Sequence, residues 1–491
     1  MASDEAAIER LQMSAVDGRA ENGRFRQDQL FSLHQTLREE AGKICAALQA
    51  DSDSSAAEVE IEFYLAMEAI KHFYDTLNFE KDLKDEYSVA HGKDNLNRRV
   101  GLGVVVIRPT SYTRFYSIVT PLAAAIAAGN CVLLDLSTTL LQTDTILRAL
   151  LTQALDVNTF AILKGSGEDL EIEGLNLVDQ TDQTSSSNHL KSSTKSRCVA
   201  IVDRSADIDA AAKAITTARF SFGGDSPYAP DLVLVNEFVK QEFFEACSRY
   251  ATLSFAGASG VRKVGKNERE EIRKAIDDAE AKRQVSTFGS NEFKLVDVLD
   301  RTASIANIKI TGRYLPIATC SSLTDAVYNQ DHGTSLLAGY FFAEPGSAKY
   351  LAQFLPCHIS LINQIPTHLL VGPAAPTAHA ADFLYRYNRD MFSVPRPQYV
   401  EKTPLVFQKV EDLLSGGSGK TTSKVTTSIL REVATKQLPP TRQSENTGVG
   451  FFESGLLTGA SIYLSMILPA LGFTAYFLGK RGVEYASKLR Q

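Results

Sequence analysis

The sequence lacks several signatures that would assign a function directly. Its six cysteines never form a Cys-x-x-Cys pair, and its eight histidines form no His-x-x-x-His pair or other metal-ligand cluster. This excludes a zinc or disulfide framework and indicates reduced, buried thiols in a cytosol-facing protein. The mild formal charge of −7 excludes the basic surface of a nucleic-acid-binding protein. The acidic, amphipathic N-terminus is unlike a signal or transit peptide.

The chain has the length of an α/β protein and the alternating strand and helix patterns that are typical of one. A chain of 491 residues with 44% hydrophobic content is long enough for two or three domains. Apolar residues at helical spacing, Leu30 to Leu48 and Val59 to Tyr74, predict N-terminal helices. Short apolar runs then alternate with helical stretches, which predicts a parallel sheet. The expected strands are 103–107, 131–134, 199–202 and 232–235, with helices at 121–128 and 208–220.

The last 80 residues differ in composition from the rest. Residues 411–454 are rich in Ser, Thr, Gly and Lys, which predicts a flexible linker. Within them, Gly416-Gly-Ser-Gly-Lys-Thr421 resembles a phosphate-binding loop, but that motif requires glycine where Leu414 stands. No strand is expected before it either. A tether is therefore the preferred interpretation over a nucleotide-binding loop.

A charge-free segment, residues 455–479, follows the linker. At ~1.5 Å per residue it would extend ~37 Å, enough to cross the ~30 Å hydrocarbon layer. A buried core helix is the alternative, but the preceding tether favours a transmembrane helix. The basic residues of the tail, 480–491, mark its boundary. We expect a single-pass protein with a cytosol-facing body, at the endoplasmic reticulum or the mitochondrial outer membrane.

Four motifs resemble one known family. The loop Phe222-Gly-Gly-Asp-Ser-Pro-Tyr-Ala-Pro-Asp231 is similar to the nucleophile loop of aldehyde dehydrogenases, especially their fatty-aldehyde (class 3) branch. The segments 101–112, 120–131 and 315–319 also match family segments. The resemblance implies a two-lobed α/β fold with parallel Rossmann-type sheets. It assigns residues 1–194 to N-terminal helices and a degenerate NAD(P)-binding lobe, 195–375 to the former catalytic lobe, and 376–410 to a return segment and dimer arm.

The residues that carry the family's chemistry are replaced. The nucleophilic cysteine corresponds to Pro227, which has neither a thiol nor an N–H group. The oxyanion-binding asparagine corresponds to Ser111, whose side chain is shorter and has no amide. The general-base glutamate aligns near Ser193, and no acidic residue lies between His189 and Val202. The resemblance therefore implies that no catalytic residue is intact.

The cofactor contacts are degenerate too. Thr110 replaces the family's tryptophan, and Asp135 replaces the lysine that contacts the adenosine ribose, so that repulsion replaces attraction beside a polyphosphate. Residues 166–190 contain no counterpart of the Phe-Thr-Gly-Ser motif. Gly312-Arg-Tyr314 stands where a glutamate would bind the nicotinamide ribose. We expect no cofactor.

Two nearby residues are candidate replacements for the nucleophile. Ser226 adjoins Pro227, but no His or Glu is placed by the sequence to activate it. Cys198 lies beside Arg197, whose charge would lower a thiol pKa. Cysteine at the start of a strand is more often a packing residue.

The resemblance thus implies a membrane-anchored relative of aldehyde dehydrogenases without oxidoreductase activity. A scaffold or ligand-binding role in lipid or secondary metabolism is the first hypothesis, with a small-molecule ligand of unspecified class. The alternative is an NAD(P)-dependent aldehyde dehydrogenase with a rearranged site, using NAD or NADP. Family members dimerise through an arm, for which 95–100 and 396–402 are the matching segments, so a homodimer is expected.

Overall fold

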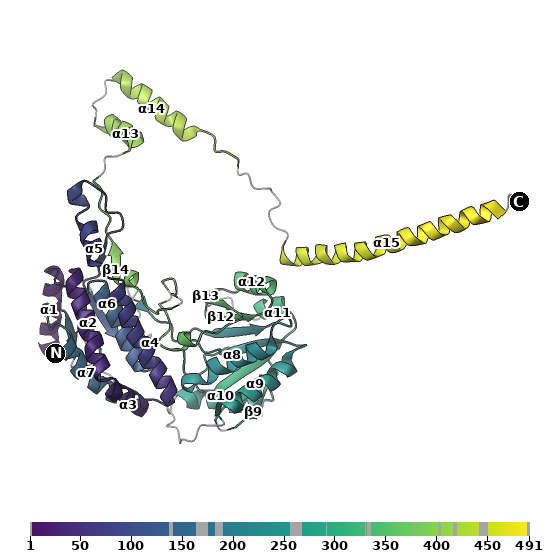
Figure 1. Cartoon of the computed structure of the whole chain (residues 1–491), viewed down its shortest axis with the longest axis horizontal. Helices are drawn as coiled ribbons and strands as arrows, with labels where there is room; N and C mark the ends of the chain where they lie inside the picture. The colour runs from purple at the N-terminus through teal and green to yellow at the C-terminus, as the bar shows by residue number, and fades with distance from the viewer. Residues whose placement is uncertain are drawn as a thin grey trace. The chain divides into compact units, whose positions relative to one another are not determined.

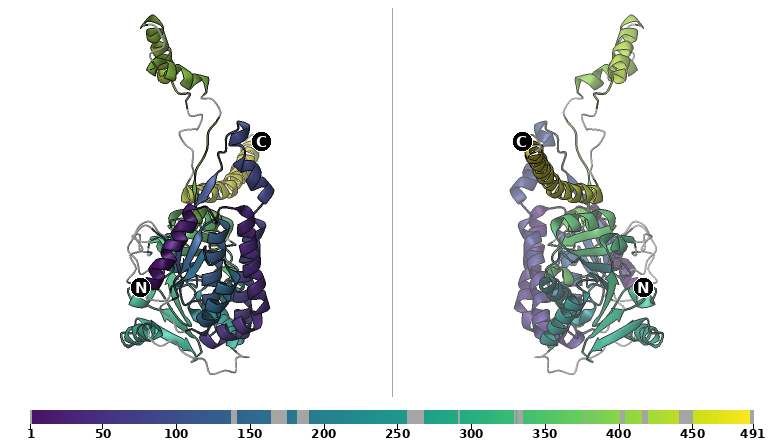
Figure 2. Two further views of the ribbon diagram at one scale, coloured as in Figure 1. Left: turned by 90° about the vertical axis from the view of Figure 1, so that its left-hand side faces the viewer. Right: turned by 90° about the vertical axis from the view of Figure 1, so that its right-hand side faces the viewer.

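The computed structural model describes residues 2–136, 141–163, 175–181, 190–255, 268–290, 292–328, 330, 335–376, 378–382, 384–400, 404–415, 420–440 and 450–488. The chain divides into two compact units, Met1–Glu401 and Lys402–Gln491. The first unit contains both large sheets (Figures 1 and 2).

The first lobe is built on a five-stranded sheet of order β4-β3-β2-β5-β6, in which every pair is parallel. Its strands are β2 (Val104–Arg108), β3 (Cys131–Leu134), β4 (Phe160–Ile162), β5 (Asn176–Asp179) and β6 (Leu190–Lys191). Alternate residues face opposite sides. Val104 and Val106 pack toward α1 (Ala2–Val16), whereas Val105 and Ile107 pack toward the other helices.

Those other helices gather beside this sheet, and α4 reaches the second lobe (Figure 1). They are α2 (Gly23–Glu39), α3 (Ala41–Asp51), α4 (Ala56–Asp75), α5 (Phe79–Glu86), α6 (Arg114–Ala127) and α7 (Gln142–Ala154). The predicted helix over 30–48 is divided at Glu40. Helix α6 begins seven residues before the predicted start, so Pro121 lies inside it.

The second lobe is a seven-stranded sheet of order β13-β12-β7-β8-β11-β10-β9, parallel except for the β9–β10 pair. Its strands are β7 (Cys198–Val202), β8 (Leu232–Asn236), β9 (Val285–Gly289), β10 (Lys294–Val298), β11 (Tyr314–Cys320), β12 (Leu336–Phe342) and β13 (Cys357–Ile362). Helices α8 (Ile208–Phe220), α9 (Lys240–Phe255), α10 (Glu268–Ala281), α11 (Leu323–Tyr328) and α12 (Pro345–Phe354) accompany them. Strands β7, β8 and β12 are wholly buried, as expected for a parallel sheet covered on both faces.

Short elements complete the first unit. The single-turn helices are η1 (Val89–His91), η3 (Ser221–Gly224), η4 (Ser304–Ala306), η5 (Thr367–Leu370) and η6 (Arg389–Phe392). Strand β1 (Arg99–Gly101) pairs antiparallel with β14 (Ser393–Pro395), and a bridge joins Asn95 to Gln398. The two segments expected to form an arm therefore lie side by side. Asn130 Nδ2 donates to Phe392 O over 3.0 Å, which ties the return segment to the first lobe.

The second unit differs from the sequence-based expectation. We predicted a boundary at 410 and a flexible linker over 411–454, but α13 (Leu405–Leu414) spans that boundary and α14 (Lys420–Thr435) is a helix. The polar composition of this segment led us to miss a helical pattern. Val425, Ile429 and Val433 recur every four residues, as on one face of a helix. Gly416 to Gly419 of the phosphate-loop-like motif lie outside the described residues.

The segment predicted to cross a membrane is part of α15 (Phe451–Lys488), which continues into the basic tail. Residues Glu453–Arg481 are long and apolar enough to cross a bilayer, and no described residue buries them.

Candidate functional site

The loop between α8 and β8 keeps a tightly constrained backbone. Phe222, Gly223 and Gly224 have φ angles of 51°, 73° and 78°. A Cβ atom on Gly224 would lie 2.2 Å from Gly312 O, so only glycine fits. The amide of Phe222 donates to Glu58 Oε1 over 2.6 Å. Contacts with Gly312 and Glu58 thus fix the chain reversal, and no nucleophilic group takes part in them.

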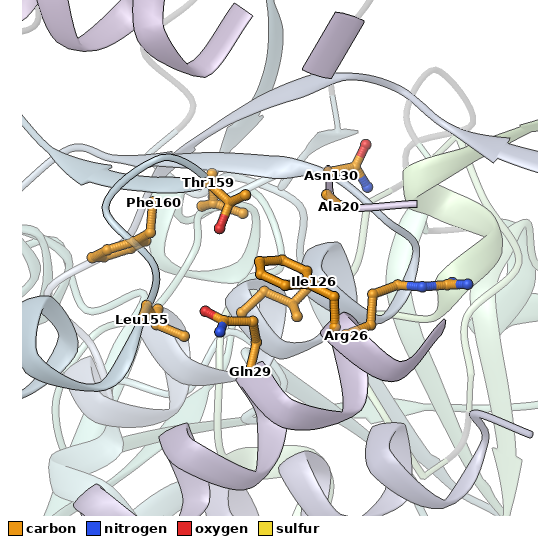
Figure 3. Close-up of a pocket in the computed structure, with 10 residues that line it drawn as sticks. Ala20, Arg26, Gln29, Ile126, Asn130, Leu155, Thr159 and Phe160 are labelled. Carbon is orange, nitrogen blue, oxygen red and sulfur yellow. The ribbon is translucent and has the colours of Figure 1, made fainter. Parts of the chain in front are cut away.

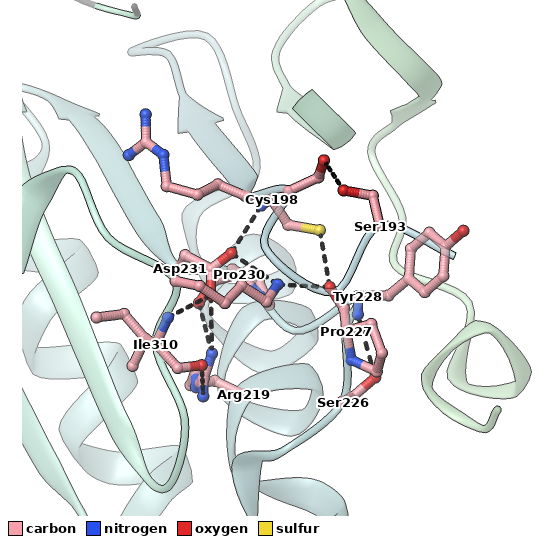
Figure 4. A network of polar contacts seen from close by, with 12 residues as sticks. Ser193, Cys198, Arg219, Ser226, Pro227, Tyr228, Pro230, Asp231 and Ile310 are labelled. Atoms are coloured by element: carbon pink, nitrogen blue, oxygen red, sulfur yellow. Dashed lines mark hydrogen bonds and ion pairs between the residues drawn. The ribbon is translucent and has the colours of Figure 1, made fainter. Parts of the chain in front are cut away.

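A buried charge network holds the end of this loop (Figure 4). The carboxylate of Asp231 is fully buried, 3.5 Å from Arg219 Nη1 and 2.9 Å from Lys309 Nζ. It also accepts hydrogen bonds from the amides of Cys198 at 2.7 Å and Ile310 at 2.9 Å. These bonds satisfy the carboxylate and join the loop to β7 and to the segment before β11. Its role is therefore structural.

Pro227, at the position matched to the nucleophile, is half-buried and presents only a carbonyl oxygen to polar neighbours. Lys309 Nζ donates to that oxygen over 2.6 Å, and Cys198 Sγ donates over 3.3 Å. Burial raises the pKa of the Cys198 thiol to about 12, against a smaller lowering by Lys309. Arg197, the expected activator, instead donates to Ala306 O over 2.7 Å. Cys198 is therefore a neutral packing residue, because burial changes the pKa of its thiol more than the nearby positive charge does.

The other candidate nucleophile, Ser226, is buried and donates to Leu370 O over 2.8 Å. Tyr112 Oη donates to the same oxygen over 2.6 Å. The segment after β13 thus closes over both the loop that follows β2 and the loop that contains Pro227. Gly372 N donates to Thr113 Oγ1 over 2.9 Å at the same junction. The Ser226 hydroxyl is used to hold these segments together.

The positions matched to the oxyanion donor and the base do not converge on Pro227 by any described hydrogen bond. Ser111 is exposed, and Thr110 donates its amide to Gln180 Oε1 over 3.0 Å. Ser193 Oγ lies 2.6 Å from Ser196 Oγ within the segment that joins the lobes. Thr110 and Ser193 thus bond to neighbouring protein atoms, and no described contact gives the three residues a catalytic geometry.

At the carboxyl edge of the five-stranded sheet, where doubly wound folds bind dinucleotides, Asp135 is paired. Its Oδ2 lies 3.1 Å from Arg108 Nε, and both side chains are largely buried. A polyphosphate at this edge would therefore meet the Arg108–Asp135 ion pair and not an isolated carboxylate. Arg108 is the last residue of β2 and Asp135 follows β3, so the two charged side chains lie at the same sheet edge and pair with each other.

Carboxylates of this chain also occupy the two helix N-termini that follow β2 and β3. Glu62 Oε1 accepts from the amides of Phe115 at 2.9 Å and Tyr116 at 3.3 Å, in the first turn of α6. Asp51 accepts from the amides of Gln142 at 3.0 Å and Thr143 at 2.8 Å, at the start of α7. Free N–H groups at such positions bind phosphate. Here internal acids already use them.

Glu62 is a site residue that we did not predict. Burial raises its pKa from 4.5 to about 7, although its two backbone hydrogen bonds act in the opposite direction. A signal was present in the sequence: Glu62 shares the apolar face of Val59, Ala66 and Ile70, where a carboxyl group needs a buried partner. Its partner lies 53 residues away, at Phe115.

Gln180 occupies the junction between β2 and β5, the point at which the strand order reverses. Its Oε1 accepts from Thr110 N, and its Nε2 donates to Ser117 O over 2.9 Å and to Tyr387 Oη over 3.0 Å. Ser117 O is available because Pro121, four residues later, has no N–H to donate. The amide therefore links the loop after β2, helix α6 and Tyr387 at this junction.

Other expected cofactor positions have structural partners or lie outside the described residues. Arg313 Nε donates to Phe220 O over 3.3 Å, and its guanidinium lies 5.0 Å from the Phe255 ring. Of residues 166–190, the structure describes only 175–181 and Leu190.

A small cavity lies on the α2 side of the five-stranded sheet (Figure 3). It has a volume of about 10 Å³, room for no more than one water molecule. It is bounded by Arg26 and Gln29 of α2, Ile126 of α6 and Phe160 of β4. It is too small for a substrate. Among the described residues, no group of three potential ligands could hold a metal ion.

The comparisons with known proteins identify the family. The model of the aldehyde dehydrogenase family matches residues 5–368. The chain belongs to this family. It is 25% identical over 386 residues to aldehyde dehydrogenase family 3 member B3 of Mus musculus, covering 72% of this chain and 78% of the relative.

A further relative and a solved structure are also similar to the chain. The 4,4'-diaponeurosporen-aldehyde dehydrogenase of Staphylococcus aureus is 24% identical over 359 residues, covering 66% of this chain and 76% of the relative. A solved structure titled the substrate-bound state of Staphylococcus aureus AldH superimposes with a TM-score of 0.66 at 21% identity, covering 82% and 94% of the two chains. The predicted aldehyde-dehydrogenase-like α/β fold with parallel sheets is confirmed.

Proposed function

We propose that this family member no longer oxidises aldehydes and acts as a membrane-anchored scaffold or ligand-binding protein. The observation that carries the proposal is Pro227, whose position in the family loop leaves only a carbonyl oxygen, bonded to Lys309 and Cys198. The neighbouring hydroxyl of Ser226 is bonded to a main-chain carbonyl. No covalent route through a thiolate or alkoxide is available at this loop.

The cofactor side supports the same proposal. Gln180 bridges the junction of β2 and β5, and Asp51 and Glu62 fill the helix N-termini beside it. A dinucleotide would have to displace several buried hydrogen bonds, and each broken bond that leaves a buried group unpaired costs about 1–3 kcal/mol. We therefore propose that the protein binds neither NAD nor NADP.

The anchor would be α15, with residues 455–479 in the bilayer and the body facing the cytosol. Its charge-free length and the absence of covering described residues support this assignment. The proposed location is the surface of the endoplasmic reticulum or the mitochondrial outer membrane, in lipid or secondary metabolism. We propose a homodimer, with the paired segments at β1 and β14 as its arm.

The activity test uses purified full-length protein with NAD or NADP and either hexanal or a long-chain aldehyde. We expect no NADH or NADPH production above a blank without protein. Turnover that rises in proportion to protein concentration would support the alternative, an NAD(P)-dependent dehydrogenase with a rearranged site. An active class 3 relative is assayed in parallel as a control for the quality of the substrates.

The localisation test compares fluorescent fusions with and without residues 451–491. We expect membrane labelling for the full chain and diffuse cytosolic signal for the truncated one. Membrane labelling that persists after truncation would contradict the role of α15.

A further inference from the structure

Helix α14 carries an exposed apolar stripe, which we define as Val425, Ile429 and Val433. At 100° per residue these positions span an arc of ~80° on the helix. Their side chains are 55%, 40% and 64% exposed. Arg431 lies ~200° around the helix from Ile429, on the other side. The helix is therefore amphipathic, with one apolar face that the described residues leave uncovered.

The charge of this segment is opposite to that of the whole chain. Residues 420–436 contain four basic residues, Lys420, Lys424, Arg431 and Lys436, and one acidic residue, Glu432. The chain carries a formal charge of −7. A short amphipathic helix with a basic polar side is the pattern of a segment that lies in a membrane interface.

The connection to α15 limits where α14 can go. Residues 436–452 separate the end of α14 from the apolar stretch of α15 that starts at Glu453. At no more than ~3.5 Å per residue, this connection reaches at most ~60 Å. If α15 spans the bilayer, α14 is therefore always near its surface, and binding there becomes an intramolecular event with a high effective concentration.

We propose that α14 lies along an anionic membrane surface, with its apolar stripe in the lipid and its basic residues among the headgroups. The proposal rests on the proposed insertion of α15. It adds a second membrane contact to the chain and specifies the lipid chemistry, because lysine and arginine bind negatively charged headgroups. Removing one of these basic residues should weaken the bound state about fivefold.

The experiment exploits the absence of tryptophan from the chain. An Ile429→Trp variant of the full chain contains a single tryptophan, on the apolar stripe. A Thr427→Trp variant is the matched control, two positions away and on the other side of α14. Both are reconstituted into vesicles of phosphatidylcholine alone or mixed with phosphatidylserine, and flotation reports whether the chain is anchored.

We expect both variants to float with either vesicle, and only Ile429→Trp to show blue-shifted emission and loss of iodide quenching, in the phosphatidylserine vesicles. Adding Arg431→Glu to Ile429→Trp should reverse that shift in part. Flotation with water-exposed emission for Ile429→Trp would overturn the inference while leaving the anchor intact. Failure to float would overturn the anchor and the inference together. A blue shift that is equal in neutral vesicles would overturn the role of anionic lipid.

Discussion

The Pro227 loop and the carboxyl edge of the five-stranded sheet differ in how they depart from the family's chemistry. The loop keeps its backbone framework, in which Gly224 packs against Gly312 and Asp231 lies in the buried charge network. Only at Pro227 is the residue that would carry the reactive atom replaced. At the sheet edge the protein's own side chains accept from the amides at the starts of α6 and α7, and Gln180 bonds across the junction of β2 and β5. The comparison indicates that the family framework persists where its polar groups stabilise the fold. It changes where the family's polar groups bind a ligand.

The largest effect is expected at the frame of the loop. Asp231→Ala would leave Arg219 and Lys309 without their buried counter-charge, which should lower the free energy of unfolding by about 3–5 kcal/mol. Denaturant unfolding of the full chain in detergent measures this. Asp209→Ala is the control, because its ion pair with Arg249 is exposed and should contribute less than about 1 kcal/mol. Equal effects of the two substitutions would show that the network does not hold the loop.

Glu62 should make the stability of the sheet-edge lobe depend on pH. Its pKa is about 7 in the folded protein against an ordinary value of 4.5, so the folded state holds a proton that the unfolded state has lost. The free energy of unfolding should therefore fall by roughly 3 kcal/mol as the pH rises through this window, and level off above it. Glu62→Gln should remove this fall, as measured by unfolding at several pH values. The Glu68→Gln variant, at a partly exposed position of the same helix, is the control, and an unchanged slope in Glu62→Gln would refute the assignment.

The Arg108–Asp135 pair should have a smaller effect, since Arg108 is partly exposed. Asp135→Ala should destabilise the protein by about 1.5–3 kcal/mol, the usual contribution of a hydrogen bond to a charged group. The double variant Arg108→Met/Asp135→Leu should recover most of that loss, because an apolar pair needs no counter-charge. Additive losses in the double variant would show that the two residues act separately.

The smallest effect is expected from restoring the nucleophile alone. Pro227→Cys should leave aldehyde oxidation at background, because Ser193 and Ser111 supply neither a base nor an oxyanion amide and the sheet edge stays closed. Production of NADH or NADPH by this variant, and not by Pro227→Ala, would mean that the site needs only its thiol.

Apolar patterns predicted the framework, and tertiary contacts account for what they missed. The run Cys131–Leu134 matches β3 because four consecutive apolar residues suit a strand buried on both faces. The predicted helix began at Pro121, whereas α6 begins at Arg114, and Gln180 takes the carbonyl that Pro121 frees. The Arg108–Asp135 pair and the Asp51 cap join residues far apart in the sequence. No local pattern reveals such partners.

Equilibrium binding of NAD and NADP to the full-length protein, measured by isothermal titration calorimetry, tests the central claim most directly. The closed sheet edge predicts no saturable heat with either cofactor, under conditions in which an active class 3 relative binds. Saturable binding of either dinucleotide at micromolar concentration would contradict the account, since it would require the Gln180 junction to open.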